Sequence, residues 1–259
     1  MSDAPAWDPE AAYARILERA RADPTVVGIV VFGSRGAGAF VVADSDVDAM
    51  VIVAGTNDEA ERWATRHGSE VEVWAMTLDE FRGHALPGTP SAWNRPTFLR
   101  VRIDLDRLDG EIERIVERLR RLTADEATAL ADTALDDYIN SLYRSLRNLE
   151  GGRLLEGRLD GIETIGPLLT SAFALEGRVR PFNKWLPFEL AAEPLVQPDL
   201  VDLRVLVEAI LDDPTTDRQR RAFRAVERAA RAAGHGAIVD SWEPDVAWLR
   251  GDARAEESR

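Results

Sequence analysis

The sequence predicts a two-part α+β chain, in which strands alternate with helices over residues 1–122 and helices alone follow over residues 123–250. Two observations carry this prediction. Short apolar or alternating runs recur in the first part, as is typical of strands. From Ala124 onward, apolar residues instead repeat with helical spacing. Residues 251–259 are mostly polar and charged, and we expect a disordered tail there.

The first part opens with an amphipathic helix over residues 9–21, because Ala12, Ile16 and Ala20 share one face and Pro24 ends the pattern. The next elements follow from apolar runs, alternation and capping residues. In chain order we expect strands over 25–32 and 46–53, a helix over 56–66, a strand over 69–77, a helical turn over 78–83, a loop over 87–96, a strand over 98–106 and a helix over 111–122.

The second part begins with a long helix whose apolar stripe ends at Gly151. Its opposite stripe is polar and includes Asp137 and Arg144. This stripe is either a solvated face, or it presents one of these two side chains to a cleft. Further helices are expected over 157–175, with a kink at Pro167, and over 199–211, 215–233 and 238–249.

The segment between two of these helices, residues 178–188, is rich in cationic, aromatic and proline residues. One interpretation is an ordered loop in which Trp185 and Phe188 fill the core. The other is a ligand contact: Lys184, the single lysine of the chain, would bind phosphate as a point charge, and the aromatic rings would stack on a ring of the ligand.

Composition limits the class of protein. The 259 residues are 45% hydrophobic and 30% charged, which is typical of a globular chain. A net charge of −14 disfavours a nucleic-acid partner, which needs a basic surface, and suits either a cationic small substrate or solubility alone. The sequence has no cysteine, no apolar run of membrane-spanning length and no signal-peptide pattern, so we expect a cytoplasmic protein without a membrane partner.

Two aspartates, Asp46 and Asp48, open the second predicted strand and project from the same face, because side chains alternate along a strand. Residues 49–53 are apolar on both faces, so this strand should be buried and the two charges should repel in a poorly solvated place. A divalent cation would offset that repulsion, and Mg²⁺ prefers carboxylate and phosphate oxygens. The alternative is a solvated acidic turn that also includes Asp44.

The turn after the first strand has the composition of a phosphate-binding loop. Gly33 allows a close backbone approach or a positive φ. Ser34 offers a hydroxyl and an amide, and Arg35 adds a cation. Gly-Ser after a strand is by itself a common turn. The joint pattern is more specific, because a short loop then leads to Ser-Asp-x-Asp and a second apolar strand.

The stretch FGSRGAGAFVVADSDVDAMVIV resembles the signature of the DNA polymerase β-like nucleotidyltransferase superfamily, in which Gly-Ser follows an apolar residue and Asp-x-Asp lies on the next strand. The resemblance implies a mixed-sheet nucleotidyltransferase domain that uses two Mg²⁺ ions and a nucleoside triphosphate. It places Gly33 and Ser34 against triphosphate oxygens, and we expect Arg35 to join them. It places Asp46 and Asp48 on the metals. The motif covers the first part of the chain and does not specify the acceptor.

The superfamily signature also includes a third carboxylate on a later strand. In the strand over 69–77, Glu70, Glu72 and Trp74 share one face. We prefer Glu72, which lies further into the strand and whose V-E-V context resembles the strand with a catalytic Glu in aminoglycoside nucleotidyltransferases. Glu72 would accept the proton of the acceptor hydroxyl or join the metal shell.

Other interpretations of the third carboxylate stay open. Glu70 is the alternate on the same strand. Asp104 and Asp106 are rivals on the strand over 98–106. An edge strand with a solvated Glu face would explain the pattern without any bound metal.

The residues and the resemblance together imply a Mg²⁺-dependent enzyme that transfers a nucleoside monophosphate, AMP from ATP, to a hydroxyl of a small molecule and releases pyrophosphate. An aminoglycoside-like cation is one acceptor class, and the helical part would close the acceptor pocket. Asp137, Arg144 and Trp74 are the substrate-binding candidates. The alternatives are a protein-modifying or antitoxin-type nucleotidyltransferase, and a non-catalytic nucleotide-binding protein on the same fold.

Overall fold

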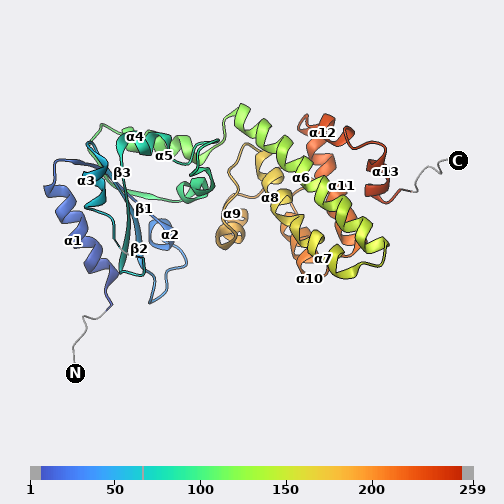
Figure 1. The fold of residues 1–259 in the computed structure, drawn as a ribbon, viewed down its shortest axis with the longest axis horizontal. Coiled ribbons are helices and arrows are strands. Elements are labelled where there is room, and N and C mark those ends of the chain that lie inside the picture. The colour runs from blue at the N-terminus through green and yellow to red at the C-terminus, as the bar shows by residue number, and fades with distance from the viewer. Residues whose placement is uncertain (1–6, 66, 253–259) are drawn as a thin grey trace, which may run out of the picture. The chain divides into compact units, whose positions relative to one another are not determined.

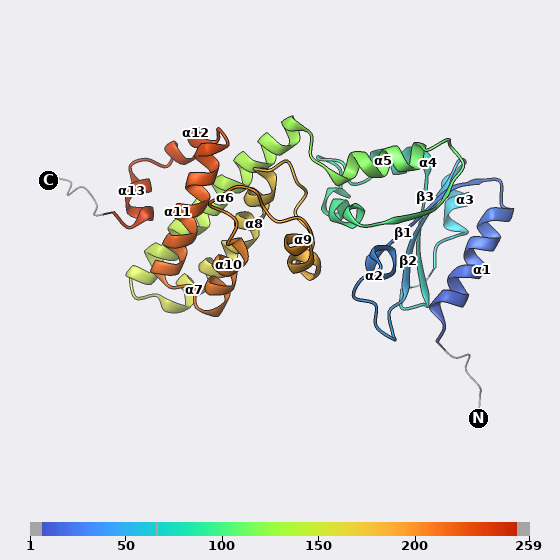
Figure 2. The same cartoon turned by 180° about the vertical axis from the view of Figure 1, so that it is seen from behind.

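The computed structural model describes residues 7–65 and 67–252, and the chain divides into two compact units, residues 1–120 and 121–259. Each unit has its own hydrophobic core. Among the described residues, all strands of the sheet belong to the first unit, and the second unit is helical (Figures 1 and 2). The fold class is therefore α+β, as predicted. Residues 253–259 of the predicted tail lie outside the described residues.

A mixed four-stranded sheet organises the first unit. Its elements are α1 (Pro9–Ala22), β1 (Val26–Phe32), α2 (Gly33–Ala37), β2 (Val47–Val53), α3 (Asn57–Glu61), β3 (Val71–Thr77), α4 (Leu78–Gly83), the 3₁₀ helix η1 (Ala92–Leu99), β4 (Arg102–Asp106) and α5 (Glu111–Arg120). The strand order is β3-β2-β1-β4. Strands β2 and β4 are antiparallel to β1, and β3 is parallel to β2.

Helices cover both faces of this sheet (Figures 1 and 2). Ile29 and Val31 of β1 belong to the core that includes residues of α1, whereas Val30 and Phe32 belong to the core that includes residues of α4, η1 and α5. The alternation follows from the two-residue period of a strand. Strands β1 and β2 are therefore packed on both faces.

Three predictions about the first unit are wrong. The helix expected over 56–66 is confined to α3, Asn57–Glu61, and residues 62–65 after it are not helical. The expected turn after β1 is the short helix α2, which Gly33 makes possible by taking a φ of +65° where the chain bends out of the strand. The expected loop over 87–96 contains the start of η1, which also takes in the beginning of the strand predicted over 98–106. Burial explains η1: Asn94 and Arg95 are buried, and Arg95 Nε donates to the carbonyl of Leu119 at 2.9 Å.

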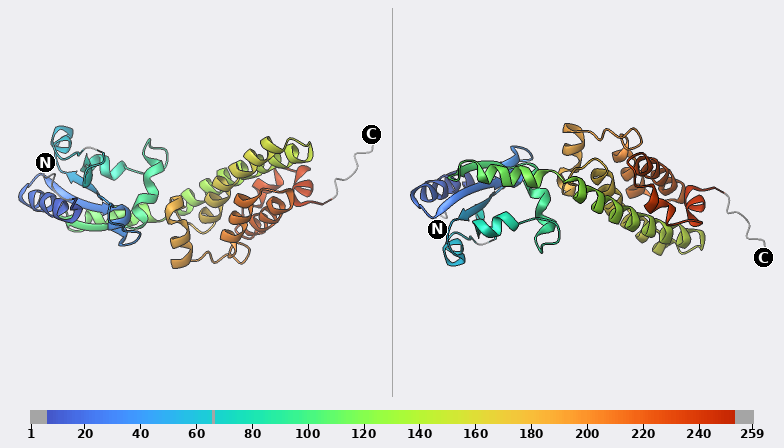
Figure 3. Two further views of the ribbon diagram at one scale, coloured as in Figure 1. Left: turned by 90° about the horizontal axis from the view of Figure 1, so that it is seen from below. Right: turned by 90° about the horizontal axis from the view of Figure 1, so that it is seen from above.

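The second unit packs around the long helix α6 (Figures 1 and 3). Its elements are α6 (Ala124–Glu150), α7 (Leu154–Glu163), α8 (Ile165–Ala174), the 3₁₀ helix η2 (Asn183–Trp185), α9 (Leu186–Ala192), α10 (Leu203–Asp212), α11 (Thr216–Ala232), α12 (Gly236–Asp240) and α13 (Asp245–Arg250). The helix predicted over 157–175 breaks at Thr164, so that Pro167 lies in the first turn of α8, where a missing N–H is tolerated. The helix predicted over 238–249 is likewise divided, between α12 and α13.

Within the part of the chain that the structure describes, no helix combines the length and the apolar character that crossing a bilayer requires.

Two glycines of α7 allow it to pack closely on α6. Ser145 Oγ of α6 donates to the carbonyl of Gly157 at 2.7 Å. A Cβ added to Gly161 would lie 2.7 Å from Cβ of Pro214 and 3.1 Å from Ser145 Oγ. Real Cβ atoms do not approach a carbon this closely, so a side chain at residue 161 requires the backbone to shift.

We therefore expect Gly161→Ala to lower the free energy of unfolding by about 1–3 kcal/mol, as overpacking does in other cores. Urea denaturation monitored by circular dichroism measures the change. Gly166→Ala in α8 is the matched control, because its Cβ would lie 3.9 Å from Nη1 of Arg180, an ordinary van der Waals distance. That variant should be unchanged or stabilised by up to about 1 kcal/mol. Equal stability of the two variants would contradict this account of the packing.

A buried carboxylate joins α11 to α13. The side chain of Glu227 is 6% exposed and accepts hydrogen bonds from Arg231 Nε at 2.9 Å and Arg250 Nε at 2.8 Å. Burial acts to raise the pKa of Glu227, but the hydrogen bonds from Arg250 and Arg231 outweigh it, so the pKa lies below its usual range. The ionised form is therefore the one that stabilises the folded unit.

The sign of the pH dependence follows from this lowered pKa. The stabilisation by Glu227 is complete above the pKa of an unfolded Glu, about 4.3, and is lost as the pH falls through the lower folded pKa. We expect Glu227→Gln to be less stable than the wild type at pH 7, and the difference in unfolding free energy to shrink as the pH falls below about 4.3. Urea denaturation across this pH series tests it, and a difference independent of pH would refute it.

Candidate functional site

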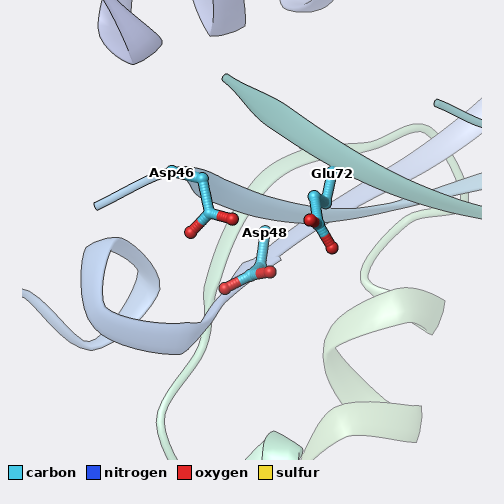
Figure 4. Close-up of side chains that lie close together, drawn as sticks. All are labelled: Asp46, Asp48 and Glu72. Carbon is cyan, nitrogen blue, oxygen red and sulfur yellow. The ribbon is translucent and has the colours of Figure 1, made fainter. Parts of the chain in front are cut away.

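Three carboxylates converge at one end of the sheet. Asp48 of β2 lies opposite Glu72 in the parallel β2–β3 pair, and Asp46 precedes β2 on the same side. One oxygen from each carboxylate lies within 4.8 Å of the other two (Figure 4). The register of β3 on β2 thus brings together the three acidic residues that the sequence analysis selected.

The short helix α2 begins against this cluster. A Cβ on Gly33 would lie 2.2 Å from Oδ2 of Asp48, so a side chain here would displace the Asp48 carboxylate, and the positive φ also favours glycine. Ser34 follows as the second residue of α2, and its carbonyl accepts hydrogen bonds from the amides of Gly38 and Ala39. A Cβ on Gly36 would come within 2.3 Å of the carbonyl oxygen of Val31, so the lack of a side chain there allows α2 to lie close to β1.

Arg35 holds the segment that carries Asp46. Its Nε donates to the carbonyls of Ser45 and Asp46 at 3.0 and 3.1 Å, and its Nη2 donates to Ser45 O at 2.9 Å. Its Nη1 pairs with Glu10 of α1 at 2.5 Å, and the side chain is 14% exposed. No pattern in the sequence indicates these partners. They give Arg35 a structural role beside Asp46, and its contact with phosphate stays a prediction.

Glu72 is oriented by the loop before β3. Its Oε1 accepts a hydrogen bond from the amide of Gly68 at 2.6 Å and pairs with His67 Nδ1 at 2.7 Å. The Gly68 amide first, and then His67, lower the pKa of Glu72. Glu70 lies just before β3 and has a different partner. Its Oε1 accepts a hydrogen bond from the amide of Asp8 at 2.6 Å. His67 was missed in the sequence because a contact across a four-residue loop leaves no periodic signal.

The rivals on β4 lie elsewhere. Strand β4 is on the other side of β1 from β2, and Asp104 accepts hydrogen bonds from the Tyr13 hydroxyl at 2.6 Å and from Arg102 Nε at 2.7 Å. Burial acts to raise the pKa of Asp104, but hydrogen bonds from Arg102 and Tyr13 outweigh it and lower the pKa. Asp106 pairs with Gly28 near the opposite end of β1 from α2 and accepts from a backbone amide after β4. Neither aspartate belongs to the cluster.

The remaining candidates differ in their surroundings. Trp74 lies in the first unit, on the same strand as Glu72, and is partly exposed. Asp137, Arg144 and Lys184 belong to the second unit. Asp137 is exposed on α6, Arg144 forms ion pairs with two acidic residues of α7, and Nζ of Lys184 lies 5.6 Å from the ring centre of Trp185. Their roles in ligand binding stay predictions.

The acidic cluster fits a divalent cation. All three donors are carboxylate oxygens, which suit Mg²⁺ better than softer metals. The three groups are partly buried, so that solvent screens their mutual repulsion less than at an open surface. Asp46, Asp48 and Glu72 are the residues that would hold the ion.

The partners of Arg35 lead to a test. In Arg35→Met the carbonyls of Ser45 and Asp46 lose their donors, while the side chain keeps a similar length. We expect the amides of residues 43–48 to exchange faster with deuterium, and Mn²⁺, measured by electron paramagnetic resonance, to bind about 10- to 100-fold more weakly, as for other residues that support metal ligands.

A matched control is Arg62→Met, because Arg62 is 61% exposed and lies 3.8 Å from its acidic partner. It should change neither deuterium exchange at residues 43–48 nor Mn²⁺ affinity. If Arg35→Met leaves both unchanged but weakens ATP binding, then Arg35 acts on phosphate and the positioning role is wrong.

No protein-family model matches the chain, and no curated protein matches it either. A solved structure described as a nucleotidyltransferase-like protein from Exiguobacterium sibiricum 255-15 is similar to 94% of this chain and to 87% of its own chain. The identity between the two is 16% and the TM-score is 0.48. Similarity at this level is too low to assign a function to the chain.

Proposed function

We propose that this protein is a Mg²⁺-dependent nucleotidyltransferase that transfers a nucleoside monophosphate, AMP from ATP, to a hydroxyl group of a small molecule. The observation that supports the proposal most strongly is the convergence of Asp46, Asp48 and Glu72 within 4.8 Å, directly against Gly33. An acidic cluster alone has many explanations. A cluster that adjoins the Gly-Ser of the superfamily signature has far fewer.

In the proposed reaction, the acceptor oxygen attacks the α-phosphorus. The bond from this phosphorus to the oxygen that bridges the α- and β-phosphates breaks, and pyrophosphate leaves with the electron pair. Glu72 is the proposed recipient of the hydroxyl proton, and Gly33 and Ser34 are the proposed contacts of the triphosphate. Bound Mg²⁺ would supply positive charge to the attacking and leaving oxygens.

The proposed acceptor is a small cationic molecule, with aminoglycoside-like compounds as one class. The net charge of −14 supports a cationic acceptor over a nucleic acid, because nucleic-acid binding depends on basic surfaces that release counterions. Lys184 is proposed as a further phosphate contact, and Asp137 and Arg144 as contacts of the acceptor.

Replacing the proposed metal ligands tests the function. We expect Asp46→Asn and Asp48→Asn each to reduce pyrophosphate release from Mg²⁺-ATP by more than about 100-fold. Loss of a residue that only supports a metal ligand costs about 10- to 100-fold, and these changes remove the charge of a ligand itself. The assay uses a panel of aminoglycosides and other amino sugars, with coupled detection of pyrophosphate. Circular dichroism and urea denaturation show whether each variant is folded.

Asp44→Asn is the matched control, since Asp44 is exposed, lies two positions before Asp46 and does not belong to the cluster. It should retain wild-type activity. Full activity in a folded Asp46 or Asp48 variant would contradict the proposed metal role.

A further inference from the structure

An aromatic surface, formed by Phe32, Trp74 and Trp93, adjoins the acidic cluster. The rings of Phe32 and Trp74 lie edge to face with centres 5.7 Å apart, and those of Trp74 and Trp93 lie edge to face at 6.4 Å. Trp74 follows Glu72 by two residues on β3, so the two side chains project from one face of the sheet, about 7 Å apart along the strand. Phe32 directly precedes Gly33. The aromatic surface therefore adjoins both the acidic cluster, through Trp74, and the Gly33–Ser34 turn, through Phe32.

Two members of the aromatic surface are open to solvent. Phe32 is 8% exposed, whereas Trp74 is 39% and Trp93 is 64% exposed. The chain buries the two polar residues that follow Trp93, Asn94 and Arg95, and leaves the indole outside. This reverses the usual pattern, in which large aromatic side chains are buried and arginine is exposed to solvent. Exposed aromatic rings beside converging polar groups are typical of a ligand site.

The segment that carries Trp93 is firmly held. Asn94 Nδ2 lies 2.9 Å from His84 Nε2, Arg95 Nε donates to a carbonyl of α5, and Arg120 Nε donates to the carbonyl of Phe98 at 3.2 Å. Phe98 itself is fully buried. The indole of Trp93 thus projects from a fixed element, and binding a ligand there would require little ordering of the backbone.

We propose that Trp74 and Trp93 stack on the base of the nucleoside triphosphate, an inference that rests on the proposed function. The reacting α-phosphate would lie at the acidic cluster, and a nucleotide places its base one ribose away from that phosphate. The aromatic surface begins about two strand residues from Glu72, which is a suitable separation. Indole faces bind bases by stacking whatever the pattern of donors and acceptors on the base edge. The surface therefore contributes affinity for the nucleotide through its base.

The test compares two probes that share a triphosphate chain and differ in the base. The probes are α,β-methylene-ATP, which cannot transfer AMP, and inorganic tripolyphosphate, each with Mg²⁺ and titrated calorimetrically. For Trp93→Ala we expect the affinity for the ATP analogue to fall by about 5- to 150-fold, the range known for loss of one base–aromatic stack. The affinity for tripolyphosphate should change by less than about twofold on the same argument. We expect the same two results for Trp74→Ala.

Trp7→Ala is the matched control, because Trp7 is 46% exposed and lies before α1, outside the aromatic surface. It should bind both probes as the wild type does. Because Trp93 is largely exposed, its replacement should leave the fold intact, and urea denaturation checks this.

Each further outcome is decisive. If wild type and Trp93→Ala bind the analogue with equal affinity, the inference is wrong. The same result would be obtained if the aromatic surface bound the acceptor instead of the base. A parallel loss for both probes also overturns the inference, because the tryptophans would then act through the phosphate or metal contacts. If the wild type binds neither probe, the proposed function itself fails and the inference fails with it.

Discussion

Mutual repulsion among Asp46, Asp48 and Glu72 is the constraint on which the rest of the site depends. At 4.8 Å, the upper limit of the distance between one oxygen of each carboxylate and those of the others, two unit charges repel by about 3–4 kcal/mol at an effective dielectric constant of 20. Pairing of β2 with β1 and β3 holds these groups together despite that repulsion. The surrounding donors offset part of it: the Gly68 amide and His67 act on Glu72. A divalent cation would turn the remaining repulsion into attraction, which is why the proposed chemistry begins with metal binding.

The three mutually repelling carboxylates lie at the ends of strands that the fold anchors on both faces. Strands β1 and β2 are buried on both faces, so their ends are anchored by two separate layers of side chains. A side chain at residue 33 would displace the Asp48 carboxylate, and Arg35 donates to two carbonyls of the segment that leads into β2. Positions fixed by strand pairing and by several hydrogen bonds suit a site that must keep reacting groups in register.

Features with a local signature could be predicted from the sequence, and features that depend on distant contacts could not. Alternation along residues 69–77 placed Glu72 on the face of β3 that meets Asp48, because the strand period is fixed. By contrast, Arg35 donates to carbonyls ten and eleven residues away, which no side-chain pattern encodes. The helix η1 looked like a loop because its buried residues include Asn94 and Arg95, whose polarity conceals their burial. Trp93 was missed because the segment that carries its exposed indole was expected to be a loop.

Anomalous diffraction from crystals grown with Mn²⁺ and a non-hydrolysable ATP analogue would test the central claim most directly. The account predicts strong anomalous density between the carboxylates of Asp46 and Asp48, within coordination distance of both, with analogue phosphate oxygens completing the shell. Manganese bound elsewhere, or an empty acidic cluster at saturating Mn²⁺ and analogue, would contradict it.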